Sequence, residues 1–182
     1  MLLRISSSGS ASRMTRSASF PVSTVPISDS APMTRAAFFV AASMAVAGEQ
    51  PSEIRAVGVP VLTDKVDLCH AWIEFHSGLV ANLTASRVSA ERIRKLRLFA
   101  RDSYFSVDYA DQTVSSVQLQ RTGGDPQIVP RMVEVAQQEP LKAELEAFIA
   151  ACRNQRANIV DGRTGAAALA AAIRIRESVE GR

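Results

Sequence analysis

Histidine and cysteine are scarce in this sequence, with two of each among 182 residues. No group of them has the spacing of metal ligands, so the sequence predicts no metal site. The cysteines, Cys69 and Cys152, lie far apart, in segments predicted as strand and helix. Two such thiols are typical of a cytoplasmic protein, in which they stay reduced and buried. The sequence also lacks an apolar run long enough to favour a membrane span, so we expect no membrane partner.

The common signatures of a catalytic site are missing as well. Neither Gly-x-Ser-x-Gly nor the phosphate-binding Gly-x-Gly-x-x-Gly occurs. His70 falls on a predicted strand and His76 in a tight turn, and no serine lies at a related spacing. The carboxylates at predicted strand ends suit turn and capping roles: Asp64, Asp67, Asp108 and Asp111. We therefore predict no catalytic residue and no cofactor-binding residue in this chain.

The net charge of +3 belongs to the first quarter of the chain. Residues 1–48 contain four arginines and one aspartate, whereas residues 49–182 contain 17 basic and 17 acidic side chains. One basic cluster lies in the second segment: Arg87, Arg92, Arg94, Lys95, Arg97 and Arg101. On alternating strands these side chains divide between two faces, so we expect no nucleic-acid partner. Salt-dependent RNA binding would contradict that expectation.

The segment 1–48 differs in composition from the rest of the chain. Residues 1–32 are rich in serine and contain three prolines, which predicts disorder. A short helix is possible at 36–47. Three alternatives stay open for this segment: an organellar transit peptide, a signal sequence starting at Met33, and a mispredicted or frame-disrupted start.

Alternating apolar and polar residues predict a sheet between Leu68 and Tyr109. Ala71, Ile73 and Phe75 alternate with His70, Trp72 and Glu74, which is the period of a strand with one buried face. Further strands are predicted at 53–62, 79–88, 93–101, 104–109, 114–121 and 128–135. Gly78 suits a hairpin turn, Pro60 favours an edge position or a bend in its strand, and Pro130 favours an edge position.

Two helices are predicted at the end of the chain. The first begins at Glu139-Pro140 and carries one apolar stripe, formed by Leu141, Leu145, Phe148, Ile149 and Cys152. The second begins near Thr164, a plausible N-cap, and its buried face is mostly alanine. Together these elements predict an α+β fold, with an open, mostly antiparallel sheet and helices packed on one face.

Several segments, in this order and spacing, carry a resemblance to a known family. They are Glu53–Gly58, Phe75–Gly78, Ala81–Arg87, Arg94–Arg97 and the helix that starts at Glu139-Pro140-Leu141. The pattern resembles the C-terminal domain of the glucose-fructose oxidoreductase, inositol dehydrogenase and rhizopine-catabolism (Gfo/Idh/MocA) family. It covers residues 49–182, about three quarters of the chain, and makes 1–48 an atypical N-terminal segment.

The resemblance implies one half of an oxidoreductase. Members of this family pair a Rossmann domain, which binds NAD or NADP, with a C-terminal domain whose open sheet contacts substrate and builds oligomers. Their substrates are sugars, nucleotide sugars and cyclitols, which react at a secondary alcohol. The resemblance therefore implies a homo-oligomer through the open sheet face and a separate Rossmann domain as a further partner.

The departures from the family pattern limit what this chain does alone. The Rossmann glycines and the family's Glu-Lys-Pro segment have no counterpart, so no Rossmann domain is predicted here. The family's Asp/His helix is replaced by Ala36–Ala42, which carries no acid or base. Ser86 and Arg87 match a family pattern on a central strand, and they are the candidates for substrate or interface contact. A non-enzymatic assembly module that pairs through its open sheet face is the alternative function.

Overall fold

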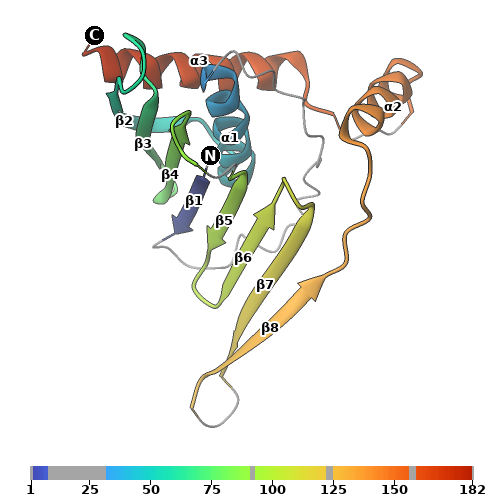
Figure 1. The fold of residues 1–182 in the computed structure, drawn as a ribbon. Coiled ribbons are helices and arrows are strands. Elements are labelled where there is room, and N and C mark those ends of the chain that lie inside the picture. Colours follow the sequence, from blue (N-terminus) through green and yellow to red (C-terminus); the bar gives the residue numbers. More distant parts are fainter. Residues whose placement is uncertain (1, 8–31, 91–92, 122–124, 156–158, 182) are drawn as a thin grey trace.

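The structure is a computed structural model that describes residues 2–7, 32–90, 93–121, 125–155 and 159–181. It consists of one eight-stranded sheet and three helices (Figure 1). Their bounds are β1 Leu2–Ser7, α1 Pro32–Ala47, β2 Pro51–Val59, β3 Leu68–Phe75, β4 Leu79–Ser86, β5 Lys95–Phe99, β6 Ser103–Asp108, β7 Thr113–Gln120, β8 Gln127–Val133, α2 Pro140–Cys152 and α3 Gly162–Glu180. The predicted α+β fold with an open, mostly antiparallel sheet is thus confirmed.

The strand order is β2-β3-β4-β1-β5-β6-β7-β8. All neighbouring strands are antiparallel except β1 and β5, which are parallel. The edge positions predicted from Pro60 and Pro130 are confirmed, because β2 and β8 are the two edge strands. The sequence did not predict that β4 and β5, which follow one another in the chain, are separated by β1.

The expectation of disorder across residues 1–32 is wrong for β1. Ile5 is completely buried and belongs to the same core as Val40 and Leu83. The serine-rich composition concealed a six-residue strand, because two registered neighbours satisfy its backbone from both sides. The possible helix at 36–47 is present and begins earlier, at Pro32. Residues 8–31, where disorder and targeting were also considered, lie outside the described residues.

The central strands have the alternation that the sequence predicted. In β4 every second residue is buried, and in β3 Ala71, Ile73 and Phe75 are buried while His70 and Trp72 are exposed. Gly78 makes the β3–β4 turn possible, since its φ of 78° lies in a region that glycine occupies without strain.

The core lies between one face of the sheet and two helices. α1 packs on β4 and α3, and α3 packs on β2. Ala171 and Ala172 of α3 are buried, and their small side chains let this helix approach closely. Thr164 is not the N-cap of α3, because the Asp161 carboxylate accepts a hydrogen bond from the Thr164 amide at 2.7 Å. Among the described elements no helix packs on the opposite face of the sheet, which is called the open face below (Figure 1).

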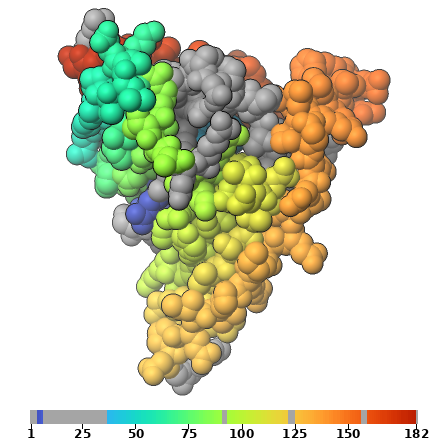
Figure 2. All heavy atoms as spheres, viewed as in Figure 1, coloured from blue at the N-terminus to red at the C-terminus, as the bar shows by residue number. Residues whose placement is uncertain are grey.

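The second half of the sheet extends into an arm. The β7–β8 hairpin tapers away from the broader body, and α2 stands apart from α1 and α3 (Figures 1 and 2). The apolar stripe predicted for α2 is present, but none of the residues of this helix is buried by the described part of the chain. Cys152, predicted to be buried, is exposed on this helix, and Cys69 is half-buried. Among the described helices, none has the length and apolarity needed to cross a bilayer.

Candidate functional site

The two candidate residues lie together where β4 ends. Arg87 forms an ion pair with Asp67, which precedes β3, and donates a second hydrogen bond to the Thr63 hydroxyl at 3.0 Å. The Arg87 amide also donates to the Asp67 carbonyl at 2.9 Å. Arg87 therefore holds the loop between β2 and β3 against the end of β4, and a third of its side chain stays exposed.

Asp67 is the anchor of that loop. Its side chain is buried, and one carboxylate oxygen accepts from the amides of Val61, Leu62 and Thr63 at 2.9, 2.7 and 3.1 Å. These backbone hydrogen bonds, together with Arg87, hold the pKa of Asp67 well below its usual range, although burial acts in the opposite direction. The carboxylate is therefore ionised at neutral pH, and this favours a structural role over proton transfer.

Ser86 closes the turn that follows β4. Its hydroxyl lies 2.8 Å from the Ser89 hydroxyl and accepts from the Val88 amide at 3.2 Å. Ser86 and Arg87 thus lie at one end of the sheet, and each makes local contacts. A contact with substrate or with a second subunit stays a prediction for both residues.

A polar and aromatic network covers the open face on β2 and β3. Trp72 donates from its indole nitrogen to Glu74 at 2.7 Å, and Arg55 pairs with both Glu74 and Glu53. The Arg55 guanidinium also lies over the Trp72 ring, 5.8 Å from its centroid. Trp72 remains 40% exposed. A large, half-exposed aromatic residue with its polar atom already bonded is typical of a protein–protein or sugar contact surface.

The network continues across the middle of the open face. The strand register aligns Arg55, Trp72, Asn82, Arg4 and Arg97 in one row that runs from β2 to β5. Arg4 lies over the Phe99 ring at 5.0 Å, and Phe99 contacts Tyr104, whose ring centroid is 4.8 Å away. The sequence separated the two faces of β3 correctly. It did not place Arg4 on this surface, because β1 was not predicted.

An ion pair and a histidine also lie on this face. Lys95 lies 3.0 Å from Asp108, whose burial would raise its pKa. The hydrogen bonds from Lys95 and from the amides of Ala110 and Asp111 outweigh that burial and lower the pKa of Asp108. The His70 ring lies 3.0 Å from the Thr84 hydroxyl on the neighbouring strand. Each of these groups has a structural partner, so the face is suited to contact more than to acid–base chemistry.

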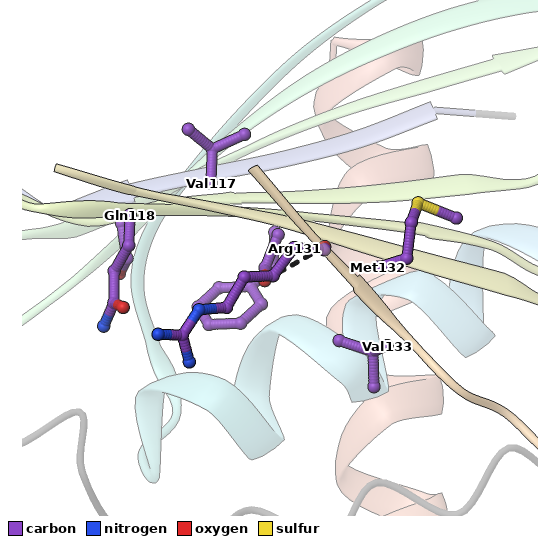
Figure 3. A pocket seen from close by; sticks show the side chains of 8 residues that line it. Val117, Gln118, Arg131, Met132 and Val133 are labelled. Atoms are coloured by element: carbon purple, nitrogen blue, oxygen red, sulfur yellow. Dashed lines mark hydrogen bonds between the residues drawn. The ribbon is translucent and has the colours of Figure 1, made fainter. Parts of the chain in front are cut away.

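A shallow hollow lies on the opposite face of the arm. Its volume is about 400 Å³, and it is formed by Ser103, Phe105, Ser116, Val117, Gln118, Arg131, Met132 and Val133. Gln118, Arg131 and Val133 point to one side of the β7–β8 hairpin, while Val117 and Met132 point to the other (Figure 3). The lining surface of the hollow is mostly apolar, and the hollow lies beyond the part of the sheet that α1 and α3 cover (Figures 1 and 3).

Comparison with known proteins assigns the fold and the family. UDP-N-acetylglucosamine 3-dehydrogenase of Acidithiobacillus ferrooxidans is 38% identical over 141 residues, which are 76% of this chain and 45% of that protein. Its solved structure matches 99% of this chain and 54% of its own, with a TM-score of 0.76 and 30% identity. The chain belongs to the Gfo/Idh/MocA family. No family model matches the chain.

More distant solved structures share the fold. Levoglucosan dehydrogenase, solved in complex with NADH, matches all of this chain and 56% of its own, with a TM-score of 0.70 and 14% identity. Aldose-aldose oxidoreductase from Caulobacter crescentus matches all of this chain and 54% of its own, with a TM-score of 0.63 and 18% identity. The chain therefore spans about half the length of the relatives it matches.

Proposed function

We propose that this chain is the substrate-binding and oligomerisation half of an NAD(P)-dependent oxidoreductase. The full enzyme would act on a secondary alcohol of a sugar, nucleotide sugar or cyclitol, in the cytoplasm. The observation that carries this proposal is the 38% identity to a UDP-N-acetylglucosamine 3-dehydrogenase of which the chain spans 45%. A nucleotide sugar is for that reason the first substrate class to test.

The N-termini of α2 and α3 do not fit a dinucleotide pyrophosphate, which supports a role for this chain other than cofactor binding. A pyrophosphate needs free amide donors at a helix N-terminus. At α2 those donors already bind the Glu139 carboxylate, at 3.2 and 2.6 Å, and at α3 the Thr164 amide binds Asp161. Carboxylates at both positions would repel phosphate. We therefore assign the nicotinamide chemistry to a separate dinucleotide-binding domain and propose that this chain is inactive alone.

In this proposal the open face of the sheet has two tasks. The part near Ser86 and Arg87 contacts substrate or a neighbouring subunit, and the surface around Trp72 pairs with a second copy of the chain. Arg87 suits an anionic substrate because part of its guanidinium side chain remains exposed beside Asp67. The protein's contribution to the reaction is then orientation of the substrate, while the nicotinamide supplies the redox chemistry.

Titration of the purified chain with NADH, NADPH and UDP-N-acetylglucosamine tests the proposal. Trp72 is the single tryptophan and lies on the open face, so its fluorescence reports a ligand or partner there. We expect no micromolar binding of either dinucleotide to the chain alone. Micromolar binding, or turnover without another domain, would refute the assignment of the cofactor site to a separate domain.

A non-enzymatic assembly module is the second candidate function. It is favoured by the aromatic and charged network around Trp72, whose polar atoms are already bonded and whose ring is half-exposed. Light scattering coupled to size-exclusion chromatography should then give a dimer or larger species for the native chain. Trp72→Ala should shift it toward the monomer, while Leu169→Ala, at an exposed position of α3, should not. A native monomer at micromolar concentration would contradict pairing through this face.

A further inference from the structure

Helix α2 is well formed but leaves its apolar stripe uncovered. Pro140 occupies its first turn, and the Glu139 carboxylate caps the amides of Leu141 and Lys142. Four large apolar side chains follow one another along one face: Leu141, Leu145, Phe148 and Ile149. They are 45, 53, 60 and 46% exposed. The caps and the sequence therefore specify a helix whose apolar face is not buried by the described residues.

Such a helix needs a partner surface. Helices of about 13 residues are marginal in water, and most of their stability comes from packing one apolar face. Among the described elements none packs closely on α2. The partner that buries the stripe is therefore not found in the described part of this chain.

The relatives indicate what that partner is. The structural match covers 99% of this chain, so α2 belongs to the matched half of the relative. The other 46% of the relative's length has no counterpart in this chain. Separating two domains of one protein exposes the surface between them. On the open face the polar atoms of Trp72 and Arg55 are bonded, whereas the α2 stripe offers only uncovered apolar surface.

We propose that the α2 stripe is the surface on which the dinucleotide-binding domain docks. This inference rests on the proposed function, and it adds the surface through which the two halves join. Cys152 continues the same face one turn beyond Phe148 and Ile149 and is exposed. Its thiol therefore reports on whether the stripe is covered.

The test combines the full chain with the part of the Acidithiobacillus ferrooxidans dehydrogenase that this chain does not match. Both are co-expressed, and the complex is isolated in the presence of NADH. We expect a stoichiometric complex in which alkylation of Cys152 slows at least about tenfold. Leu145→Asp and Phe148→Asp should weaken the complex about 30-fold or more, as loss of an interface hot spot does. Glu146→Gln, which lies outside the apolar stripe of α2 and whose side chain is 66% exposed, is the matched control and should change nothing.

A fusion of the same two parts removes any dependence on association between separate chains. In the fusion, Cys152 should again be protected, and Phe148→Ala should restore its reactivity without a change in helix content. An NADH-binding complex or fusion with an unprotected Cys152 would overturn the docking surface and leave the proposed function standing. Absence of NADH binding in both formats would instead refute the proposed function. Self-association of the chain alone that Phe148→Asp abolishes would assign the stripe to a second copy, and would also overturn the proposal.

Discussion

Substitution of Gly58 by alanine tests how closely α3 approaches the edge of the sheet. An ideal Cβ at Gly58 would lie 2.4 Å from Val179 Cγ1 and 2.7 Å from Val66 Cγ1. Both distances are far below van der Waals contact, and valine side chains have little rotamer freedom with which to withdraw. Gly58→Ala should therefore push α3 or the 60–66 loop away from β2.

The expected magnitude follows from two opposing effects. Overpacking of this kind typically costs about 1–3 kcal/mol. The lower conformational entropy of the unfolded alanine variant offsets about 0.4–1 kcal/mol of this loss. The net loss of unfolding free energy is then about 1–2 kcal/mol, which for a chain of this size lowers Tm by about 2–8 °C.

Thermal and urea unfolding followed by circular dichroism measure this effect. Gly165→Ala is the matched control, because no heavy atom lies within 4 Å of its ideal Cβ in α3. It should stabilise the protein, by up to about 1 kcal/mol. Repeating Gly58→Ala in a Val179→Ala background should recover part of the loss, since the closest clash is removed. Equal stability of Gly58→Ala and the native chain, or no recovery in that background, would refute the close approach.

Three further predictions concern titratable groups. Because the pKa of Asp67 is lowered, its contribution to stability is present above its ordinary pKa of 3.8 and is lost as the pH falls below that value. Asp67→Asn should make the unfolding free energy depend less on pH in the acid range. Arg87→Met should have a smaller effect of the same kind, because the three amide donors to Asp67 remain. Burial raises the pKa of Tyr109 from 10.0 to about 12. The contribution of Tyr109 to the stability of the folded state is therefore complete below pH 10 and is lost as the pH rises toward 12. Tyr109→Phe should reduce the unfolding at alkaline pH that circular dichroism measures. Cys152 should react with a thiol reagent faster than Cys69, because Cys69 is half-buried and burial raises its pKa. Equal reaction rates of the two thiols in the native protein would contradict the exposure of α2.

The sequence predicted those features that short-range patterns encode. The period-2 alternation located β3 and β4 and separated their faces, because burial on one side imposes the pattern on each strand independently. Gly78, Pro60 and Pro130 marked a turn and two edges through their backbone restrictions. The family resemblance then rested on the same segments.

Features that depend on distant partners were not predictable. β1 has no convincing pattern of its own, and only its two neighbours, β4 and β5, make it a strand. The role of Arg87 beside Asp67 required knowledge that the β2–β3 loop folds back against the end of β4. The apolar stripe of α2 was identified correctly, but its periodicity carries no information on which molecule buries it.

The central position of β1 also determines how the chain folds. β4 and β5 are close in sequence, but the gap between them is filled by residues about 80 positions earlier than their partners on β4. Closing so long a loop is slow, and so β1 should be among the last strands to pair. Until it inserts, β4 and β5 each present an unpaired edge that can add strands from other molecules. The rate at which β1 pairs with β4 and β5 should therefore decide whether this protein folds or aggregates.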